Sequence, residues 1–457
     1  MSWTAVNPAT GETLKEYPEL TREELEAVLQ EAHQTQKSWR STPYSHRADR
    51  LRRAAALLRE RVEEHALLMT QEMGKPLSEA RGEVEKCAWV CEYYADNGED
   101  HLAPETVDTP DTDARTYVAF QPIGLVLAIM PWNFPYWQVF RFAAPNLMAG
   151  NGGILKHAPN VPGCALAIEE VFREAGFPAG LFRSVLVDLE LTSAIIEHPL
   201  IRGVTLTGSV RAGKAVASQA GDQVKKTVLE LGGSDPYIIL EDADLDATVE
   251  TCATSRMLNS GQSCIAAKRF LVVEPLREEF ERRLVARMGQ AVMGDPMDEK
   301  TTLGPQARPD LRDELHQQVR ESVEAGARLL LGGELPEGPG AFYPATVLTD
   351  VAPGMRAYHE ELFGPVATII GVADEAEAVR VANDTVFGLG AAVFTADRQR
   401  GERLAREELD AGACFVNAFV RSDPRLPFGG VKESGYGREL SPFGIREFVN
   451  IKTVWVQ

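Results

Sequence analysis

The sequence is poor in the features that mark secreted, membrane or nucleic-acid-binding proteins. Six cysteines lie scattered through 457 residues, which is too few for a disulfide framework. No apolar run approaches the roughly 20 residues that a membrane span needs, and the first residues lack the basic and apolar segments of a signal peptide. The formal net charge of −20 disfavours binding to nucleic acid or to an anionic membrane surface. We therefore expect a cytoplasmic protein without either partner.

The pattern that is present is an alternation of strands and helices, in a chain long enough for more than one domain. A helical region at 21–97 comes first. Apolar strands separated by helical patterns follow at 124–130, 152–156, 181–187, 203–207 and 227–231. This alternation predicts an α/β fold with an open parallel sheet, which binds dinucleotides at the carboxyl ends of its strands. A second α/β unit begins after Gly233, and we expect residues 414–417 to be its last core strand.

Two short motifs contain residue types that suit covalent catalysis. Glu230 lies inside the apolar run Thr227–Gly233, where burial would raise the pKa of its carboxyl group. Cys264 follows a helical pattern and a Gly-Gln-Ser turn. A carboxylate base and a cysteine nucleophile are the two halves of a thioester mechanism. The alternatives are a salt-bridged structural carboxylate and a buried, inert thiol.

In this order and at this distance, the two motifs resemble the aldehyde dehydrogenase superfamily, and the resemblance extends over the whole chain. Further matching blocks are Pro131–Pro135, Glu361–Pro365 and Pro427–Gly435. The resemblance implies oxidation of an aldehyde to a carboxylic acid with NAD or NADP. Cys264 would attack the aldehyde, the Asn133 amide would hold the oxyanion, and Glu230 would act as the base that hydrolyses the thioester.

The resemblance also assigns a set of coenzyme-binding residues: Trp132, Lys156, Pro159, Gly208, Ser209, Leu231, Glu361 and Phe363. In the family the lysine holds the adenosine ribose, and many NAD-preferring members place a glutamate three residues later. Here that position is Pro159, so no carboxylate repels a 2′-phosphate, while Lys156 and His157 add positive character. The sequence therefore predicts NADP, with NAD as the alternative.

Arg141 is the candidate for substrate recognition. It lies eight positions after Asn133 on a helical stretch, where a guanidinium could clamp a carboxylate bidentately. Succinate-semialdehyde dehydrogenases, a group within the superfamily, resemble this chain in that arginine and in a serine before the Pro-Phe-Gly-Gly block, here Ser422. The chain departs from some of them at Leu258, where they have a second arginine.

We therefore predict oxidation of succinate semialdehyde to succinate. One alternative is that Arg141 forms an intrachain ion pair and the enzyme acts on neutral aldehydes. A remoter one is a non-catalytic structural protein with this fold.

The resemblance implies three parts. These are a Rossmann-like coenzyme-binding domain at 1–102 and 123–231, an α/β catalytic domain at 232–435, and a small β bridging element at 103–122 and 436–457. The strand-like tail could pair with a second subunit at its edge, which predicts a homodimer or a homotetramer. Cys87 and Cys91 share one helix face, but no histidine or second cysteine pair completes a metal site. We expect them to pack in the core, and we predict no bound metal.

Overall fold

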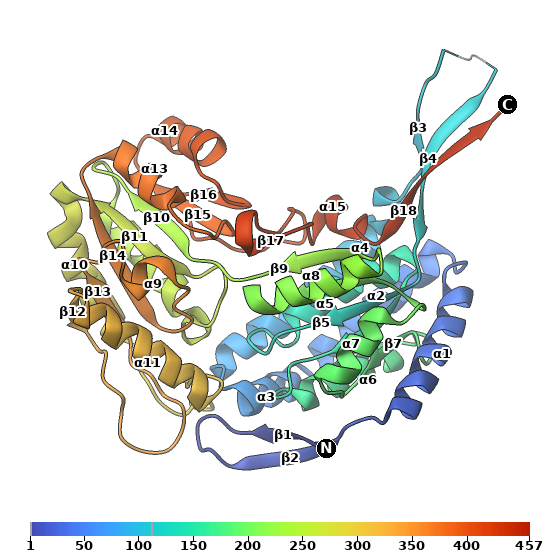
Figure 1. The fold of residues 1–457 in the computed structure, drawn as a ribbon, viewed down its shortest axis with the longest axis horizontal. Helices are drawn as coiled ribbons and strands as arrows, with labels where there is room; N and C mark the ends of the chain where they lie inside the picture. Colours follow the sequence, from blue (N-terminus) through green and yellow to red (C-terminus); the bar gives the residue numbers. More distant parts are fainter. Residues whose placement is uncertain (1, 111–112) are drawn as a thin grey trace.

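The structure is a computed structural model that describes residues 2–110 and 113–457, and it consists of two α/β lobes and a projecting arm (Figure 1). The first lobe contains a six-stranded sheet of order β17-β9-β8-β5-β6-β7, and the second a seven-stranded sheet of order β12-β13-β14-β11-β10-β15-β16. The predicted α/β class is confirmed. Within those residues, no helix is long and apolar enough to cross a bilayer.

The first sheet contains all five strands that the sequence predicted, and they are mutually parallel: β5 (Leu125–Ile129), β6 (Gly152–Lys156), β7 (Phe182–Ser184), β8 (Ile201–Thr207) and β9 (Lys226–Glu230). The short β17 (Gly435–Tyr436) adds an antiparallel strand beside β9. The helices of this sheet are α5 (Trp137–Ala149), α6 (Pro162–Glu174), α7 (Leu189–Glu197) and α8 (Val210–Asp222). Because the strands are parallel, Lys156, Thr207 and Glu230 end at one edge of the sheet.

The N-terminal region adds a hairpin of β1 (Ser2–Val6) and β2 (Thr13–Pro18), followed by four helices: α1 (Arg22–Trp39), α2 (Tyr44–Glu60), α3 (Val62–Met73) and α4 (Leu77–His101). Helix α1 begins at the predicted capping box, in which Thr21 and Glu24 each accept from the other's backbone N–H. Cys87 and Cys91 of α4 are fully buried in the apolar core, as their spacing predicted.

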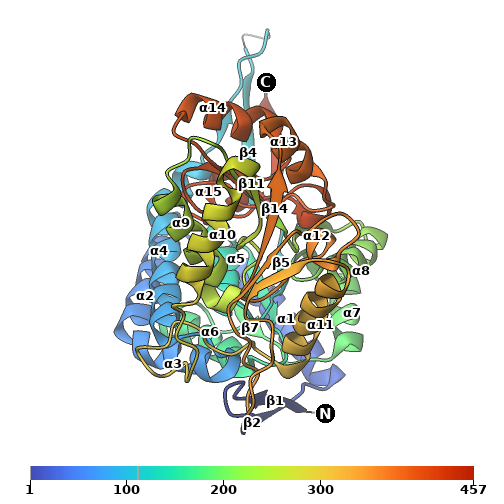
Figure 2. The same ribbon diagram turned by 90° about the vertical axis from the view of Figure 1, so that its left-hand side faces the viewer.

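The second sheet has apolar cores on both faces, because alternate residues of β10 face opposite sides. Figure 2 shows helices on either side of it. Its strands are β10 (Asp235–Ile239), β11 (Ala267–Val273), β12 (Arg328–Leu331), β13 (Thr346–Thr349), β14 (Val366–Val372), β15 (Gly390–Phe394) and β16 (Ala413–Val416). Its helices are α9 (Leu245–Met257), α10 (Glu274–Met288), α11 (Pro309–Glu324), α12 (Arg356–His359), α13 (Glu375–Asn383) and α14 (Arg398–Arg403), with a π-helical turn η2 at Leu404–Glu408.

One expectation about this sheet is wrong. Residues 414–417 were expected to form a core strand, but β16 is the last strand in the sheet order and its residues are half-buried. An edge strand has a neighbour on one side only, so apolar composition alone does not distinguish it from a central strand.

The arm is an antiparallel sheet of β18 (Val449–Val456), β4 (Arg115–Pro122) and β3 (Glu105–Thr106) that extends away from both lobes (Figure 1). It joins the two segments that the sequence grouped as a bridging element. The turns η1 (Leu258–Gly261) and η3 (Lys432–Ser434) and the short helix α15 (Ser441–Ile445) complete the described elements.

Candidate active site

Cys264 lines a cavity of about 570 Å³ between helix α4, the start of α5 and the loop after β16. Aromatic side chains form much of its wall: Trp89, Phe134, Trp137, Phe419 and Phe428. Its cationic side chains are Lys86, Arg141, Arg421 and Arg425. The carboxyl groups of Glu79, Glu83 and Asp423 also belong to the lining, so the cationic side chains outnumber the acidic ones by one. A thiol in a largely aromatic pocket of this kind suits an uncharged reacting group attached to an anionic tail.

The turn that presents Cys264 is held by backbone geometry and by one buried lysine. Asn259 and Ser260 adopt left-handed conformations, each with a φ of 54°. Lys268 of β11 donates from Nζ to the carbonyl oxygens of Ser263 at 3.0 Å and Cys264 at 2.7 Å. Burial raises the pKa of the Cys264 thiol to about 12, against the opposing effect of Lys268 and Arg141. The resting group is therefore the thiol, and it must lose a proton before it can attack.

A close approach of two backbones fixes this turn against the block at 361–365. A Cβ atom on Gly261 would lie 2.2 Å from the carbonyl carbon and oxygen of Gly364, and Gly261 has a φ of +76°. Glycine is therefore required at position 261 for both reasons. Glu361 lies in the same block, where it accepts from the backbone N–H of Gly233 at 2.9 Å and pairs with Lys268 at 3.4 Å.

Asn133 follows β5 and reaches the cysteine turn, as the sequence predicted. Its side-chain Nδ2 donates to the backbone carbonyl oxygen of Gln262 at 3.1 Å, and its backbone carbonyl oxygen accepts from Nδ2 of Asn259 at 2.7 Å. The side chain is 4% exposed. An amide nitrogen carries two hydrogens, so one remains for an oxygen that is bound beside Cys264.

Glu230 ends β9 and is 2% exposed. Burial raises the pKa of its carboxyl group well above the ordinary value, and the nearby Glu439 adds to the effect while Arg141 opposes it. Its Oε1 lies beside Gly429, 2.7 Å from the position that a Cβ would take there. Glu230 is not among the described residues that line the Cys264 cavity.

Arg141 and Ser422 both line the cavity of Cys264. Arg141 is buried, forms an ion pair through Nε with Glu439, and stacks with its guanidinium carbon 4.6 Å from the centre of the Phe428 ring. The intrachain ion pair that the sequence left open is thus present, although the side chain still reaches the cavity. Ser422 accepts a hydrogen bond from Nζ of Lys86 at 2.8 Å.

The residues expected near a nicotinamide ring lie close together. The rings of Trp132 and Phe363 meet edge to face, with centroids 5.8 Å apart. Leu231 is buried and lies against Gly213 of α8. The neighbouring Ser209 caps α8 by accepting from the Ala212 N–H at 3.3 Å. A helix N-terminus of this kind favours a phosphate group.

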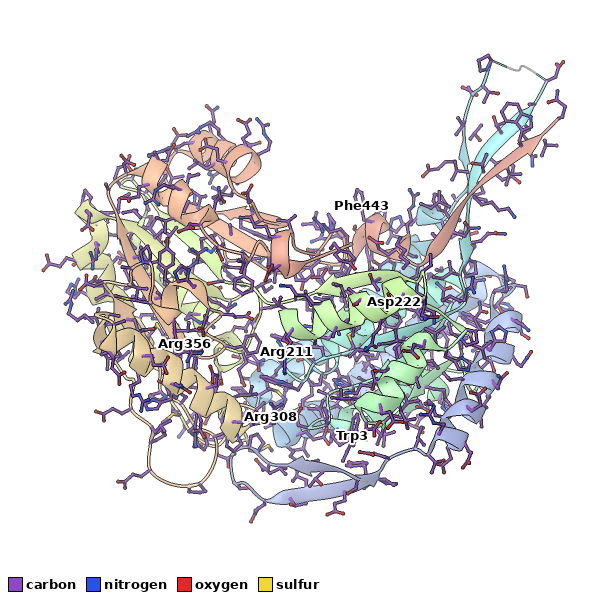
Figure 3. The ribbon with its side chains drawn as sticks, in the orientation of Figure 1. Trp3, Arg211, Asp222, Arg308, Arg356 and Phe443 are labelled. Carbon is purple, nitrogen blue, oxygen red and sulfur yellow. The ribbon has the colours of Figure 1, made fainter. Side chains whose placement is uncertain are left out.

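The residues expected near an adenosine line a second pocket of about 530 Å³, which includes Lys156 and Pro159. The Lys156 ammonium lies 5.3 Å from the centre of the Trp3 ring. Trp3 and Arg308, both labelled in Figure 3, line the same pocket from the first hairpin and from the start of α11. Neither residue was predicted from the sequence, because neither belongs to a recognisable motif.

His157 does not supply the positive character that the sequence suggested. Its Nδ1 accepts from the Ala158 N–H at 2.8 Å, so Nε2 carries the hydrogen and donates to the Pro135 carbonyl oxygen at 2.9 Å. Burial lowers the pKa of His157 to about 4, and the imidazole is neutral near pH 7. Of the two residues, only Lys156 supplies a cation to the pocket.

The chain is similar in sequence and in structure to known proteins. Residues 2–454 match the sequence profile of the aldehyde dehydrogenase family. The chain is 49% identical to a probable succinate-semialdehyde dehydrogenase (NADP(+)) of Synechocystis sp. over 100% of both chains. It is also 49% identical to succinate semialdehyde dehydrogenase (NAD(P)+) Sad of Escherichia coli, over 99% of this chain and 97% of that one. A crystal structure of succinic semialdehyde dehydrogenase from Streptococcus pyogenes with NADP+ superposes with a TM-score of 0.97 at 38% identity, over 99% of both chains.

Alkylation of Cys264 should depend steeply on pH. The raised pKa keeps the thiol protonated near neutrality, so its rate of reaction with iodoacetamide should rise about tenfold per pH unit between about pH 7 and pH 10. Mass mapping of the labelled peptide, with Cys264→Ser as the unlabelled control, gives the rate. A labelling rate that stops rising below about pH 8 would show that the pKa of the thiol is much lower than its burial implies.

Proposed function

Because the chain belongs to the aldehyde dehydrogenase family, we propose that it oxidises succinate semialdehyde to succinate with NADP as its coenzyme. The enzyme is an NAD(P)-dependent aldehyde dehydrogenase. The observation that carries the assignment of substrate is the cavity that Cys264 and four cationic side chains line together. Full-length relatives named for the same reaction support the substrate and the coenzyme.

The residues present fit NADP. The pocket beside Lys156 has room for an adenosine and has Pro159 where a glutamate would repel a 2′-phosphate. Its cations are Lys156 and Arg308, of which Arg308 is paired with Asp310, and its lining also includes the carboxyl groups of Glu19 and Asp188. Trp132, Phe363 and Glu361 lie on the side of the cysteine turn, where a nicotinamide ribose and ring would be held. When bound, NADP supplies the acceptor for the hydride that leaves the substrate carbon.

Cys264 and Asn133 carry the first half of the reaction. The Cys264 sulfur loses its proton to water and forms a bond to the aldehyde carbon, and the carbonyl oxygen becomes an alkoxide. The Asn133 amide and the backbone N–H of Cys264 donate to that oxygen and stabilise its negative charge. Loss of hydride from the carbon leaves a thioester on Cys264.

Glu230 carries the second half. A carboxyl group with a raised pKa is a stronger base once it is ionised, and it can accept a proton from the water that attacks the thioester. Its place beside Gly429 keeps it away from the thiol during acylation, and rotation brings it to the acyl group afterwards. Cleavage releases the acid and returns the proton to Cys264.

Arg141 and Ser422 hold the distal carboxylate of the substrate. Both line the cavity of Cys264, and a four-carbon substrate is short enough that its anion must be met there. The ion pair of Arg141 with Glu439 favours the alternative, in which the arginine is structural and the aromatic wall receives neutral aldehydes.

The arm supports the division into a coenzyme-binding domain, a catalytic domain and a bridging element, and it supports a homodimer or a homotetramer. Strand β18 is the last strand of its sheet, so one of its edges has no neighbour among the described strands. Ile451 and Trp455 on this strand are 63% and 51% exposed. An edge strand with exposed apolar side chains is suited to pairing with a second copy.

Glu230→Gln should separate the two halves of the reaction. The glutamine cannot take a proton, so the variant should release a burst of about one reduced coenzyme per site and then turn over about 100-fold or more slowly. Stopped-flow absorbance of the reduced coenzyme measures both phases. Cys264→Ala should show no burst while still binding NADP, and steady-state turnover of Glu230→Gln at the wild-type rate would remove Glu230 from this role.

Arg141→Ala should lower kcat/KM for succinate semialdehyde about 10- to 150-fold more than for butanal, which has no anion. The substitution also strands Glu439 as an unpaired buried carboxylate, so thermal stability should fall. The double variant Arg141→Ala with Glu439→Gln removes that charge and should regain stability but not the selectivity. Equal losses on both aldehydes in the double variant would make Arg141 structural.

The double variant Ile451→Lys with Trp455→Lys should be a single subunit in solution, because pairing of β18 with a second copy would have to bury two charges. Sedimentation or light scattering measures the mass in solution. Leu329→Lys is the matched control, since Leu329 is an exposed apolar residue on β12, the edge strand of the other sheet. A wild-type protein that is already a single subunit would contradict the proposal.

A further inference from the structure

The charged side chains that line the Cys264 cavity differ in whether they already have a partner. Arg141 is paired with Glu439, and Arg425 is paired with Asp423 at 2.6 Å. Lys86 has no carboxylate within ion-pair distance among the residues that the structure describes.

The other charged residues of the wall are Glu79, Glu83 and Arg421, and none of them forms an ion pair with Lys86. The carboxylate of Glu83 is paired with Lys75 and also accepts from two backbone N–H groups. Arg421 is exposed at the surface, whereas Lys86 is half-buried. Lys86 is therefore a half-buried cation of the cavity that has no ion-pair partner among the described residues, although Glu83 and Asp423 act on its charge from further away.

The position of Lys86 is fixed by contacts with two other segments of the chain. It lies on α4 and donates from Nζ to Oγ of Ser422 at 2.8 Å. The same ammonium lies 4.3 Å from the centre of the Trp137 ring. Glu83, one helical turn earlier on α4, accepts from the backbone N–H groups of Tyr136 and Trp137 at 2.9 Å each. These two hydrogen bonds join the start of α5 to α4, and they thereby fix the Trp137 ring beside the Lys86 ammonium.

The ammonium group is held in a site that disfavours its charge. Burial lowers the pKa of Lys86 to about 8, and the nearby Arg141 adds to the effect. At pH 7 the group still carries its proton. An anion bound beside it would replace some of the solvation that it has lost.

We propose that Lys86 joins Arg141 and Ser422 in the clamp for the distal carboxylate of the substrate and supplies the positive charge that selects an anionic aldehyde. The inference rests on the proposed function and names a residue that determines its specificity. An ammonium has three hydrogens, and Ser422 uses one, so two remain for a carboxylate. Ser422 accepts from Lys86 through its oxygen, which leaves its own hydroxyl hydrogen free to donate to the same anion.

This assignment divides the work between two cations of the cavity. The charge of Arg141 is largely offset by Glu439, so that side chain adds hydrogen-bond donors but little net field. Lys86 has no ion-pair partner among the described residues, so its charge distinguishes an anionic from a neutral aldehyde of the same length. The aromatic wall, which includes Trp137 and Phe428, contacts the methylene groups of either substrate.

The test compares wild type and Lys86→Met with succinate semialdehyde and with butanal, each with NADP. Methionine keeps most of the length and removes the charge. We expect kcat/KM for succinate semialdehyde to fall roughly 10- to 150-fold, mainly through KM, while the value for butanal changes less than about twofold. Inhibition by the product succinate should weaken by a similar factor, and Lys86→Arg should recover part of the loss.

Arg425→Met is the matched control, because it removes a cation from the same cavity that is already paired with Asp423. A loss of selectivity as large as that of Lys86→Met would show a general field effect and overturn the clamp. Equal losses of Lys86→Met on both aldehydes, with unchanged thermal stability and NADP binding, would also overturn it. Should Lys86→Met fold poorly, Ser422→Ala and Lys86→Arg provide the same comparison.

The failure of this inference can be told apart from failure of the proposed function by the wild-type enzyme alone. A wild type that does not prefer succinate semialdehyde over butanal would contradict the proposed function itself. A wild type that does prefer it, with Lys86→Met keeping the same preference, would leave the function intact and exclude Lys86 as the selecting residue.

Discussion

The rest of this structure depends on one constraint: charged side chains are buried around Cys264, whose thiol must stay neutral at rest. A charge removed from water is stable only when it is paired and hydrogen-bonded. Around Cys264 the buried pairs are Arg141 with Glu439 and Lys268 with Glu361, and a third pair, Lys75 with Glu83, fixes the start of α5. The first two pairs join segments that are distant in the sequence, and Glu83 of the third also accepts from the backbone N–H groups of Tyr136 and Trp137. The same contacts that satisfy the charges therefore also assemble the site.

The two lobes meet at this site through polar contacts as well as packing. Glu79 of α4, in the first lobe, accepts from the backbone N–H of Asn259 in the cysteine turn at 2.6 Å, and burial raises the pKa of Glu79 to about 7. Asn133, from the loop after β5, reaches the same turn at the Gln262 carbonyl. The turn of Cys264 thus belongs to one lobe and is contacted by Glu79 and Asn133 of the other, so the distance between the lobes and the geometry of the turn are set together.

The sequence predicted the parallel sheet of the first lobe well, because each strand is a short apolar run bounded by a helix of clear period. It missed β12, β13, β14 and β15, which are four to seven residues long and lie in a stretch where the helical patterns are short and widely spaced. Motifs located Cys264, Glu230 and Asn133, but no motif gives the direction of a side chain. The partner of Arg141 and the place of Lys86 depend on Glu439 and Ser422, which lie about 300 residues or more away in sequence and become neighbours only on folding.

The contact between Gly261 and Gly364 has a consequence for how this protein can change over evolutionary time. Most tight contacts in a protein interior can be relieved by shrinking one partner when the other grows, so paired substitutions open a route through sequence space. Here the atoms that would collide with a Cβ at Gly261 belong to the main chain of Gly364, and main-chain atoms cannot be made smaller. No second substitution compensates for a first at position 261. Glycine therefore has to be retained at position 261. The cavity wall around Lys86 and Arg425 is made of side chains, so substitutions there can be compensated and can change which aldehydes the cavity accepts.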